Sequence, residues 1–202
     1  MKPAPNLKLQ RKISIYALLG CVIAGLLGSP GPTHAREGGI ETEETEAEEM
    51  DTNFLARLFI QAEEATGIPR RLLAAIAAQE SSFHPWSINL DGRNHYPATK
   101  KEALDRIGNC QNFDLGLMQI NSMWLPRFGV SAEDALDPTM NVLLGSTILL
   151  DCIGRYGLWD GIACYHAGNP RRQRGVAYAA KVVAKWQSLK NVNPGDDETE
   201  RE

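Results

Sequence analysis

The chain has 202 residues, of which 43% are hydrophobic and 23% are charged, and its formal net charge is −4. This length suits one domain with a substantial core and leaves no room for a second of similar size. Between Thr52 and Gly195, 15 Lys and Arg oppose 12 Asp and Glu, so the central part carries +3, which slightly favours an anionic polymer as partner. The sequence has neither a nucleotide-binding loop nor a paired basic and aromatic stripe, so no nucleic-acid partner is expected.

The N-terminal 35 residues have the pattern of a secretory signal peptide. Basic residues precede an apolar run over Ile13–Leu27, and small residues follow up to Ala35. The run is shorter than the ~20 residues that a membrane-spanning helix needs, so we predict export with cleavage after Ala35. Retention as an anchor ranks second. Lipidation at Cys21 ranks third, because the apolar run continues beyond that cysteine.

Composition divides the remainder into three parts. Residues 36–51 form an acidic linker and residues 192–202 an acidic tail; both are predicted to be disordered, because neither has apolar residues to bury. A role in solubility is favoured over a binding role for these ends. Residues 52–191 are predicted to form the folded domain.

Start and stop signals predict a mainly helical domain. Three signals indicate helix starts: capping residues before Phe54, a proline at position 69 and a capping box at Thr99. Glycines indicate helix ends at positions 67, 157 and 168. Ser131 begins a looser capping signal. The predicted helices are 54–65, 70–83, 100–107, 140–157, 158–167 and 176–190.

Two local features are predicted between and within these helices. The segment 87–115 is rich in Gly, Asn, Asp and Pro, which predicts a loop with a small hairpin around Asp91-Gly92. In the last helix, helical spacing places Val176, Ala180, Val183 and Trp186 on one apolar face.

Cysteine usage fits an exported protein. Removal of the signal segment leaves Cys110, Cys152 and Cys164, which allow one disulfide and one free thiol. We predict the pair Cys152–Cys164, on consecutive helices, although the spacing does not determine connectivity. The spacing lacks Cys-x-x-Cys units, so no metal site is expected.

One residue interrupts an apolar stripe. Leu72, Leu73, Ile76 and Phe83 share a helix face, and Glu80 stands where that stripe should continue. Three interpretations remain open. The carboxyl reaches solvent at a helix end, or it is a buried partner of an arginine such as Arg127 or Arg155, or burial keeps it partly protonated for use as an acid.

The surrounding motifs narrow this choice. The order along the chain is AIAAQESSFHPWSIN, DLGLMQINSMWLPRF, CYHAGNP and YAAKVV. Together they resemble the catalytic domain of the soluble lytic transglycosylase family, whose fold is similar to goose-type lysozyme. The resemblance covers residues 53–190 and implies a mainly α, lysozyme-like single catalytic domain with a small hairpin or flap. It also implies no cofactor and no metal.

The resemblance implies cleavage of the β-1,4 bond between N-acetylmuramic acid and N-acetylglucosamine in peptidoglycan, with 1,6-anhydro ends as products. Glu80 would be the catalytic acid and then the base. The remaining positions match family residues that bind substrate or orient the acid: Ser81, Gly116, Leu117, Met118, Gln119, Tyr165, His166 and Tyr178. Leu117 and Met118 have packing as an alternative role, as do the two tyrosines, and Ser81 has helix-end capping.

Two further positions bear on the chemistry, His166 as a departure from the family pattern and Asp114 as a possible second carboxylate. His166 stands where the family usually has Asn, and an imidazole can be charged below neutral pH. Asp114 is the one candidate for a second carboxylate, as ordinary glycosidases require, although a turn-capping role is favoured for it.

Small exported members of this kind resemble enzymes that open the cell wall for secretion systems, conjugation channels or pili. That implies a monomer in the periplasm of a Gram-negative bacterium, with peptidoglycan glycan strands and components of such a machine as partners. Two rivals are kept: a lysozyme-like hydrolase, and an inactive peptidoglycan-binding assembly factor in which Glu80 is only structural.

Overall fold

The structure is a computed structural model, and it describes residues 52–192. The predicted signal segment and acidic linker, and the predicted tail beyond Val192, lie outside the described residues. The helices are α2 (Thr52–Thr66), α3 (Arg70–Glu80), α4 (Lys100–Ile107), α5 (Leu125–Phe128), α6 (Ala132–Ala135), α7 (Pro138–Tyr156), α8 (Leu158–Ala167) and α9 (Gln173–Val192), with a 3-10 turn η1 (Ser122–Trp124). The strands are β1 (Ile88–Leu90), β2 (Arg93–His95), β3 (Phe113–Leu115) and β4 (Ile120–Asn121). The predicted mainly helical fold is confirmed.

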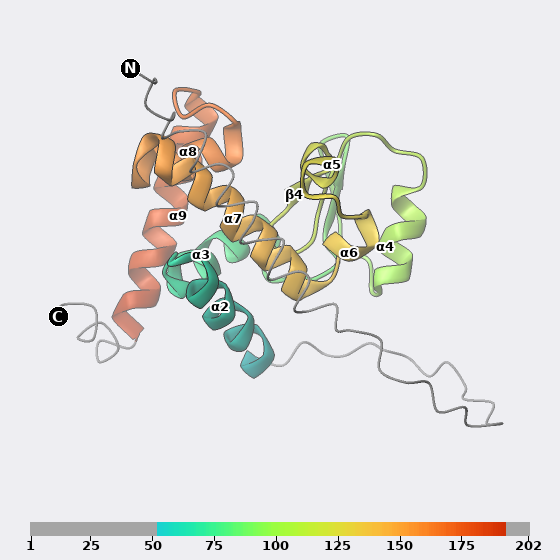
Figure 1. The fold of residues 1–202 in the computed structure, drawn as a ribbon, viewed down its shortest axis with the longest axis horizontal. Helices are drawn as coiled ribbons and strands as arrows, with labels where there is room; N and C mark the ends of the chain where they lie inside the picture. The colour runs from blue at the N-terminus through green and yellow to red at the C-terminus, as the bar shows by residue number, and fades with distance from the viewer. Residues whose placement is uncertain (1–51, 193–202) are drawn as a thin grey trace, which may run out of the picture. The chain divides into compact units, whose positions relative to one another are not determined.

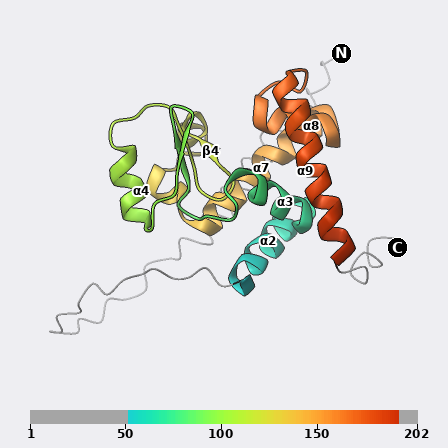
Figure 2. The same ribbon diagram turned by 180° about the vertical axis from the view of Figure 1, so that it is seen from behind.

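Helix α7 is the central element of the fold. Its residues 140–149 are all buried, as expected for a helix that is apolar on every side. Helices α2 and α8 pack against it, and α9 packs against both α3 and α8. Figures 1 and 2 show α7 running from α6, beside the strands, to the end where α8 and α9 lie. Among the described residues, no helix combines the length and the apolar character needed to span a membrane.

A small antiparallel sheet lies beside the starting end of α7. Its strand order is β2-β1-β3-β4, and the β1–β2 hairpin pairs Leu90 with Arg93. Asp91 and Gly92 form the turn with φ of 49° and 81°, which confirms the predicted hairpin. Strands β3 and β4 were not predicted, because segments of two or three residues are too short to show a strand's alternation.

Both predicted capping signals are present, the one at Thr99 in altered form and the one at Ser131 in full. The Thr99 hydroxyl accepts a hydrogen bond from the Glu102 amide, but the Glu102 carboxylate accepts from the amide of Ala98 rather than that of Thr99. Ser131 and Asp134 form a complete capping box, although α6 has only four residues. The weaker sequence signal therefore corresponds to the more complete cap.

Two helix predictions are wrong in detail. Helix α3 ends at Glu80 instead of Phe83, because Ser82 and Phe83 turn the chain with φ of 54° and 65°. In α9, Val176 is exposed and the buried side chains include Tyr178, Ala179 and Val182. Both α3 and α8 pack on α9, and they cover a face different from the one that apolar spacing predicted.

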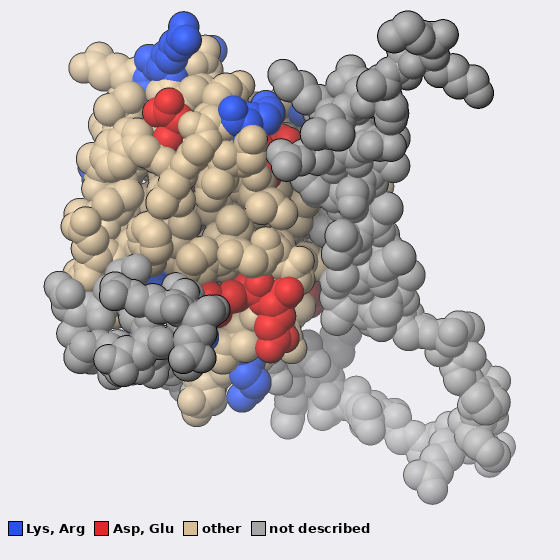
Figure 3. Space-filling model, turned by 60° about the vertical axis from the view of Figure 1, so that its left-hand side comes forward, with Lys and Arg blue, Asp and Glu red and all other residues tan. Residues whose placement is uncertain are grey.

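Charged side chains on the described surface are dispersed. On the face turned forward in Figure 3, basic and acidic side chains lie in small separate groups among uncharged residues. Several exposed pairs are helix neighbours of opposite charge, such as Lys101 with Asp105 at 2.8 Å and Arg106 with Glu102 at 2.8 Å. Exposed pairs of this kind contribute only a few tenths of a kcal/mol each. They do not determine the fold.

Candidate active site

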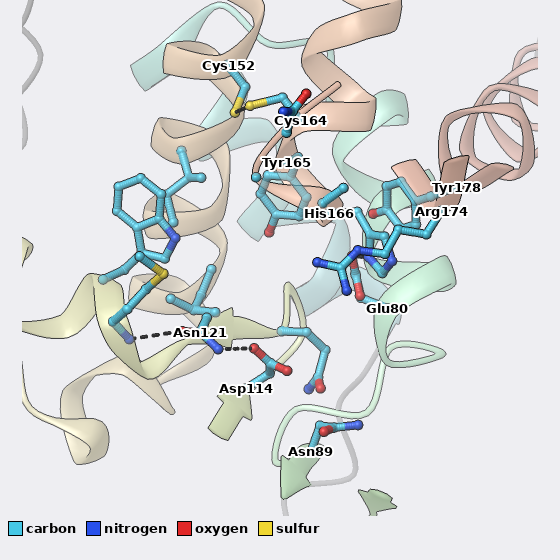
Figure 4. Close-up of a pocket in the computed structure, with 18 of the residues that line it drawn as sticks. Glu80, Asn89, Asp114, Asn121, Cys152, Cys164, Tyr165, His166, Arg174 and Tyr178 are labelled. Carbon is cyan, nitrogen blue, oxygen red and sulfur yellow. Dashed lines mark hydrogen bonds and ion pairs between the residues drawn. The ribbon is translucent and has the colours of Figure 1, made fainter. Parts of the chain in front are cut away.

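A cavity of about 900 Å³ lies where the helices meet the sheet. Glu80 of α3 and Tyr178 of α9 line it from the helical side, and Asp114 of β3 and Asn89 of β1 from the sheet. Figure 4 shows these side chains facing a common space. A cavity of this size accommodates several sugar rings or a ligand of similar volume.

Glu80 is the most strongly perturbed acid of the cavity. Its side chain is only 13% exposed, because α3 ends there against the core. Burial raises the pKa of its carboxyl to about 7; the nearby Tyr178 hydroxyl lowers the pKa, and the charge of Asp114 raises it. A carboxyl with this pKa is half protonated at neutral pH, as a general acid requires.

Neither structural interpretation of Glu80 fits this geometry. The Glu80 side chain is largely buried, and within the described residues the basic group at ion-pair distance from it is His166 rather than an arginine. Arg127 lies over the Trp124 ring at 4.8 Å, and Arg155 pairs with Asp151 at 2.5 Å. The interpretation that remains is an acid kept partly protonated by burial.

The residue after the acid anchors the end of α3. The Ser81 hydroxyl is buried and contacts two carbonyl oxygens, that of Ala77 at 3.1 Å and that of Leu117 at 2.9 Å. It therefore links the helix end to the segment 116–119, and its hydrogen bonds go to backbone carbonyls rather than to the Glu80 carboxyl. This hydroxyl positions the backbone that carries the acid.

The segment 116–119 forms a wall behind the cavity, and only Gln119 reaches the lining. Leu117 and Met118 are fully buried. Asn141 of α7 accepts a hydrogen bond from the Met118 amide at 2.7 Å and donates to the Leu115 carbonyl at 3.0 Å. Gly116 has φ of 78°, and a Cβ there would lie 2.1 Å from the Asn141 amide nitrogen, so only glycine fits.

Gln119 and Tyr165 also hold this wall in place. The Gln119 amide donates to the carbonyls of Ser87 and Gly116, each at 3.0 Å. The Tyr165 hydroxyl donates to the Met118 carbonyl at 2.6 Å. Both side chains line the cavity, but the Gln119 amide nitrogen and the Tyr165 hydroxyl are bound to backbone carbonyls. Of the residues that the motifs single out, Ser81, Gly116, Leu117 and Met118 lie behind the cavity surface instead of on it.

Tyr178 is the tyrosine that faces the acid. Its hydroxyl is buried and makes no hydrogen bond of good geometry to the described part of the chain, yet it lies close enough to Glu80 to lower the pKa of that carboxyl. Burial and the Glu80 charge in turn raise the pKa of Tyr178 well above its usual value. A neutral phenol beside the carboxyl can donate to it and so orient it.

His166 stacks on Tyr178 and faces the acid. The two rings are 4.4 Å apart and nearly parallel, at 5°, and the imidazole Nδ1 lies 4.0 Å from Glu80 Oε1. Partial burial lowers the pKa of His166, the charges of Arg174 and Lys181 lower it further, and the charge of Asp114 raises it. The imidazole is therefore neutral at pH 7.

Asp114 lies in the same cavity as Glu80. It is partly buried, which raises its pKa, and Asn121 donates to it at 2.8 Å and opposes that shift (Figure 4). Its charge raises the pKa of Glu80, so the two carboxyls interact electrostatically. The structure thus places this side chain in the cavity wall.

Cys152 of α7 and Cys164 of α8 meet at the cavity wall. Both are free thiols, and their sulfur atoms lie 2.6 Å apart. Cys110 lies apart from them and donates to the Asn112 carbonyl. Within the described residues, no group of three or more His, Cys, Asp or Glu side chains could hold a metal ion.

Sequence reasoning missed several residues of the lining. Met123 and Trp124 lie four and five residues after Gln119 and form an apolar part of the wall. Their signal was their position inside the motif DLGLMQINSMWLPRF. Arg172 and Arg174 also line the cavity, and their signal was the run of arginines after Asn169.

The helical fold with a small sheet and one buried acid in a cavity defines the class of lysozyme-like domains. Residues 57–187 match the family described as "Transglycosylase SLT domain", and the chain belongs to this family. This confirms the resemblance in the sequence motifs.

Three related proteins align with much of this chain. "Invasion protein IagB" of Salmonella typhi is 34% identical over 145 residues, which are 68% of this chain and 80% of the relative. "Type IV secretion system protein virB1" of Brucella abortus is 31% identical over 141 residues, 59% of each protein. "Peptidoglycan-binding-like protein" of Escherichia coli O157:H7 is 31% identical over 135 residues, 62% of this chain and 74% of the relative.

Proposed function

We propose that this protein is a peptidoglycan lytic transglycosylase that cleaves the β-1,4 bond between N-acetylmuramic acid and N-acetylglucosamine. The observation that carries the proposal is Glu80, a carboxyl with a pKa of about 7 that faces a cavity large enough for glycan. Membership of the transglycosylase family and the name of the Escherichia coli relative support peptidoglycan as the substrate.

The chemistry needs one carboxyl in two protonation states. Protonated Glu80 donates its proton to the glycosidic oxygen as the C1–O bond breaks, which releases the N-acetylglucosamine side as an alcohol. Glu80 is then a carboxylate and takes the proton from the 6-hydroxyl of the muramic sugar, whose oxygen bonds to C1. The products are a free hydroxyl and a 1,6-anhydro end, and Glu80 is protonated again.

The other cavity residues support these steps. Tyr178 can donate to the carboxylate form of Glu80 between them, and neutral His166 packs against the other face of that phenol. Trp124 offers an aromatic surface on which a sugar ring can stack. Ser81, Gly116, Leu117 and Met118 act as the framework that holds this arrangement.

Asp114 favours a second candidate, a lysozyme-like hydrolase. It shares the cavity with Glu80 and interacts with it electrostatically, as the second carboxylate of a glycosidase would. Its hydrogen bond from Asn121 also fits a role in holding β3 against β4. The two functions differ in their products, since a hydrolase adds water and leaves a free reducing end.

The deciding experiment is mass spectrometry of purified peptidoglycan digested by the full chain. We expect muropeptides that are lighter by one water than hydrated products, because the sugar's own hydroxyl replaces water as nucleophile. Hydrated products would identify a hydrolase and make Asp114→Asn the next variant. An undigested sample that nevertheless binds the protein would identify the binding factor.

We propose that the enzyme opens the cell wall locally during assembly of a secretion, conjugation or pilus machine. Two relatives carry names that refer to invasion and to a type IV secretion system. This role requires export, in agreement with the predicted signal segment, and places the enzyme in the periplasm as a monomer that meets glycan strands and components of the machine.

We propose further that Cys152 and Cys164 form a disulfide after export. Their sulfurs are already adjacent, and oxidation would remove two electrons and two protons to the oxidants of that compartment. Alkylation of the unreduced, unfolded protein should therefore label Cys110 alone. After reduction all three cysteines of the folded domain should react. Labelling of all three without reduction would contradict the disulfide.

A further inference from the structure

Within residues 52–192, four arginines line the cavity, and they differ in what balances their charge. Arg155 pairs with Asp151, and Arg127 stacks on Trp124. For Arg172 and Arg174, the part of the chain that the structure describes supplies no carboxylate within ion-pair distance. Two guanidinium groups therefore face the cavity without an acidic partner.

The backbone that carries these two arginines is held firmly. The Asn169 side chain accepts a hydrogen bond from the Arg171 amide at 2.9 Å, and the Asn169 carbonyl accepts from the Arg172 amide at 3.2 Å. At the start of α9, a Cβ on Gly175 would lie 2.7 Å from the Ala163 carbonyl oxygen. Helix α9 thus begins in close contact with α8, and this contact sets the position of Arg174.

Arg174 lies beside the acid. Its charge lowers the pKa of His166, whose Nδ1 is 4.0 Å from Glu80 Oε1. Figure 4 shows its guanidinium reaching into the cavity next to His166 and Glu80. A ligand group bound to Arg174 would therefore lie next to the bond that Glu80 protonates.

The two carboxyl groups of the cavity, Glu80 and Asp114, do not form ion pairs with Arg172 or Arg174. Glu80 is half neutral at pH 7, and Asp114 accepts its hydrogen bond from Asn121. A guanidinium offers a planar fork of donors that fits a carboxylate with two parallel hydrogen bonds, whereas sugar hydroxyls offer no charge to match it. The matching anion must come with the ligand.

We propose that Arg174, with Arg172, forms a subsite for a substrate carboxylate next to the scissile bond. The inference rests on the proposed function and deepens it, because it makes the enzyme selective for muramic-acid glycans over uncharged ones. Peptidoglycan offers this carboxylate from two sources. One is the lactyl group of muramic acid where no peptide is attached, and the other is the peptide stem, which carries free carboxylates.

The test measures binding in the Glu80→Gln background, so that turnover does not interfere. Calorimetry would give the Kd for three soluble glycans of equal length: stem-bearing strands, strands freed of their stems by an amidase, and the latter with the lactyl carboxyl converted to a neutral amide. The variants are Arg174→Gln and Arg172→Gln with Arg174→Gln. The matched control is Arg171→Gln, in the same turn but outside the cavity lining.

We expect Arg174→Gln to weaken binding of a carboxylate-bearing glycan by about 10-fold or more, as loss of a charged hydrogen-bonding pair predicts. Binding of the neutral glycan and of all glycans to the Arg171→Gln protein should stay unchanged. If Arg174→Gln weakens binding of stem-bearing strands alone, the peptide stem supplies the carboxylate. If it weakens binding of stem-free strands alone, the lactyl group supplies it.

Equal weakening for the neutral glycan would show that Arg174 only supports the fold, and this would overturn the proposal. Unchanged Kd values for all three glycans would overturn it as well. Cleavage by the protein with Glu80 intact is measured separately on the same strands. If the protein binds carboxylate-bearing glycans but does not cleave them, the proposed enzymatic function is wrong and the proposed carboxylate subsite is supported.

Discussion

Glu80→Gln should abolish lysis of peptidoglycan, with a fall in rate of about 1,000-fold or more, as expected for loss of general acid–base catalysis. The amide has nearly the same shape as the carboxyl and keeps the packing at the end of α3. It cannot deliver a proton to the glycosidic oxygen or take one from the 6-hydroxyl. The measurement is the clearance rate of a purified peptidoglycan suspension, together with binding of the variant to the same material.

The matched control is Glu64→Gln, which removes an exposed carboxylate from α2, outside the motifs and the cavity lining. It should lyse at the normal rate. Loss of lysis with unchanged binding in Glu80→Gln would reject the inactive binding factor. A Glu80→Gln protein that still lyses at the normal rate would show that Glu80 is not the acid, and Asp114 would then be examined first.

The same substitution should stabilise the fold above neutral pH. The Glu80 carboxyl has a pKa of about 7 in the folded protein, against 4.5 ordinarily. Because the folded pKa is the higher one, protonated Glu80 favours the folded state fully below pH 4.5, and this advantage is lost as the pH rises through 7. The difference corresponds to up to about 3 kcal/mol in the free energy of unfolding.

Denaturant unfolding at pH 4.5 and pH 8 measures this effect. Glu80→Gln should match the parent protein at the lower pH and exceed it at the higher pH, because the amide is never ionised. Glu64→Gln should show the same pH dependence as the parent. If Glu80→Gln and the parent differ equally at both pH values, the Glu80 pKa is not raised by burial, and its role as acid loses its physical basis.

Much of the helical framework was predictable from local signals. Asp137 caps α7 through the Met140 amide at 2.9 Å, and the glycines after α7 and α8 adopt positive φ, as their positions predicted. Elements that depend on contacts between distant segments were harder to predict. Strand β3 pairs with the distant strand β1, and the two-residue strand β4 then pairs with β3. The buried face of α9 depends on which helices pack against it.

The candidate site divides in the same way. Glu80 interrupts an apolar stripe, so its unusual environment was visible in the residue order, and the motifs indicated the family. Which motif residues line the cavity could not be predicted. Ser81 donates to the Leu117 carbonyl and the Met118 carbonyl accepts from Tyr165, both behind the lining. Arg174 and Trp124, outside the expected set, face the ligand space.

Short-range chemistry thus accounts for where the helices begin and end, for the hairpin and for the acid's place in the chain. These features depend on residues within about one or two helical turns of each other. The tertiary structure decided the pKa of Glu80, the contact of Cys152 with Cys164 and the shared cavity of Asp114, His166 and Arg174. Desolvation and electrostatic coupling depend on distances in space between segments far apart in the sequence, and only the folded chain sets those distances.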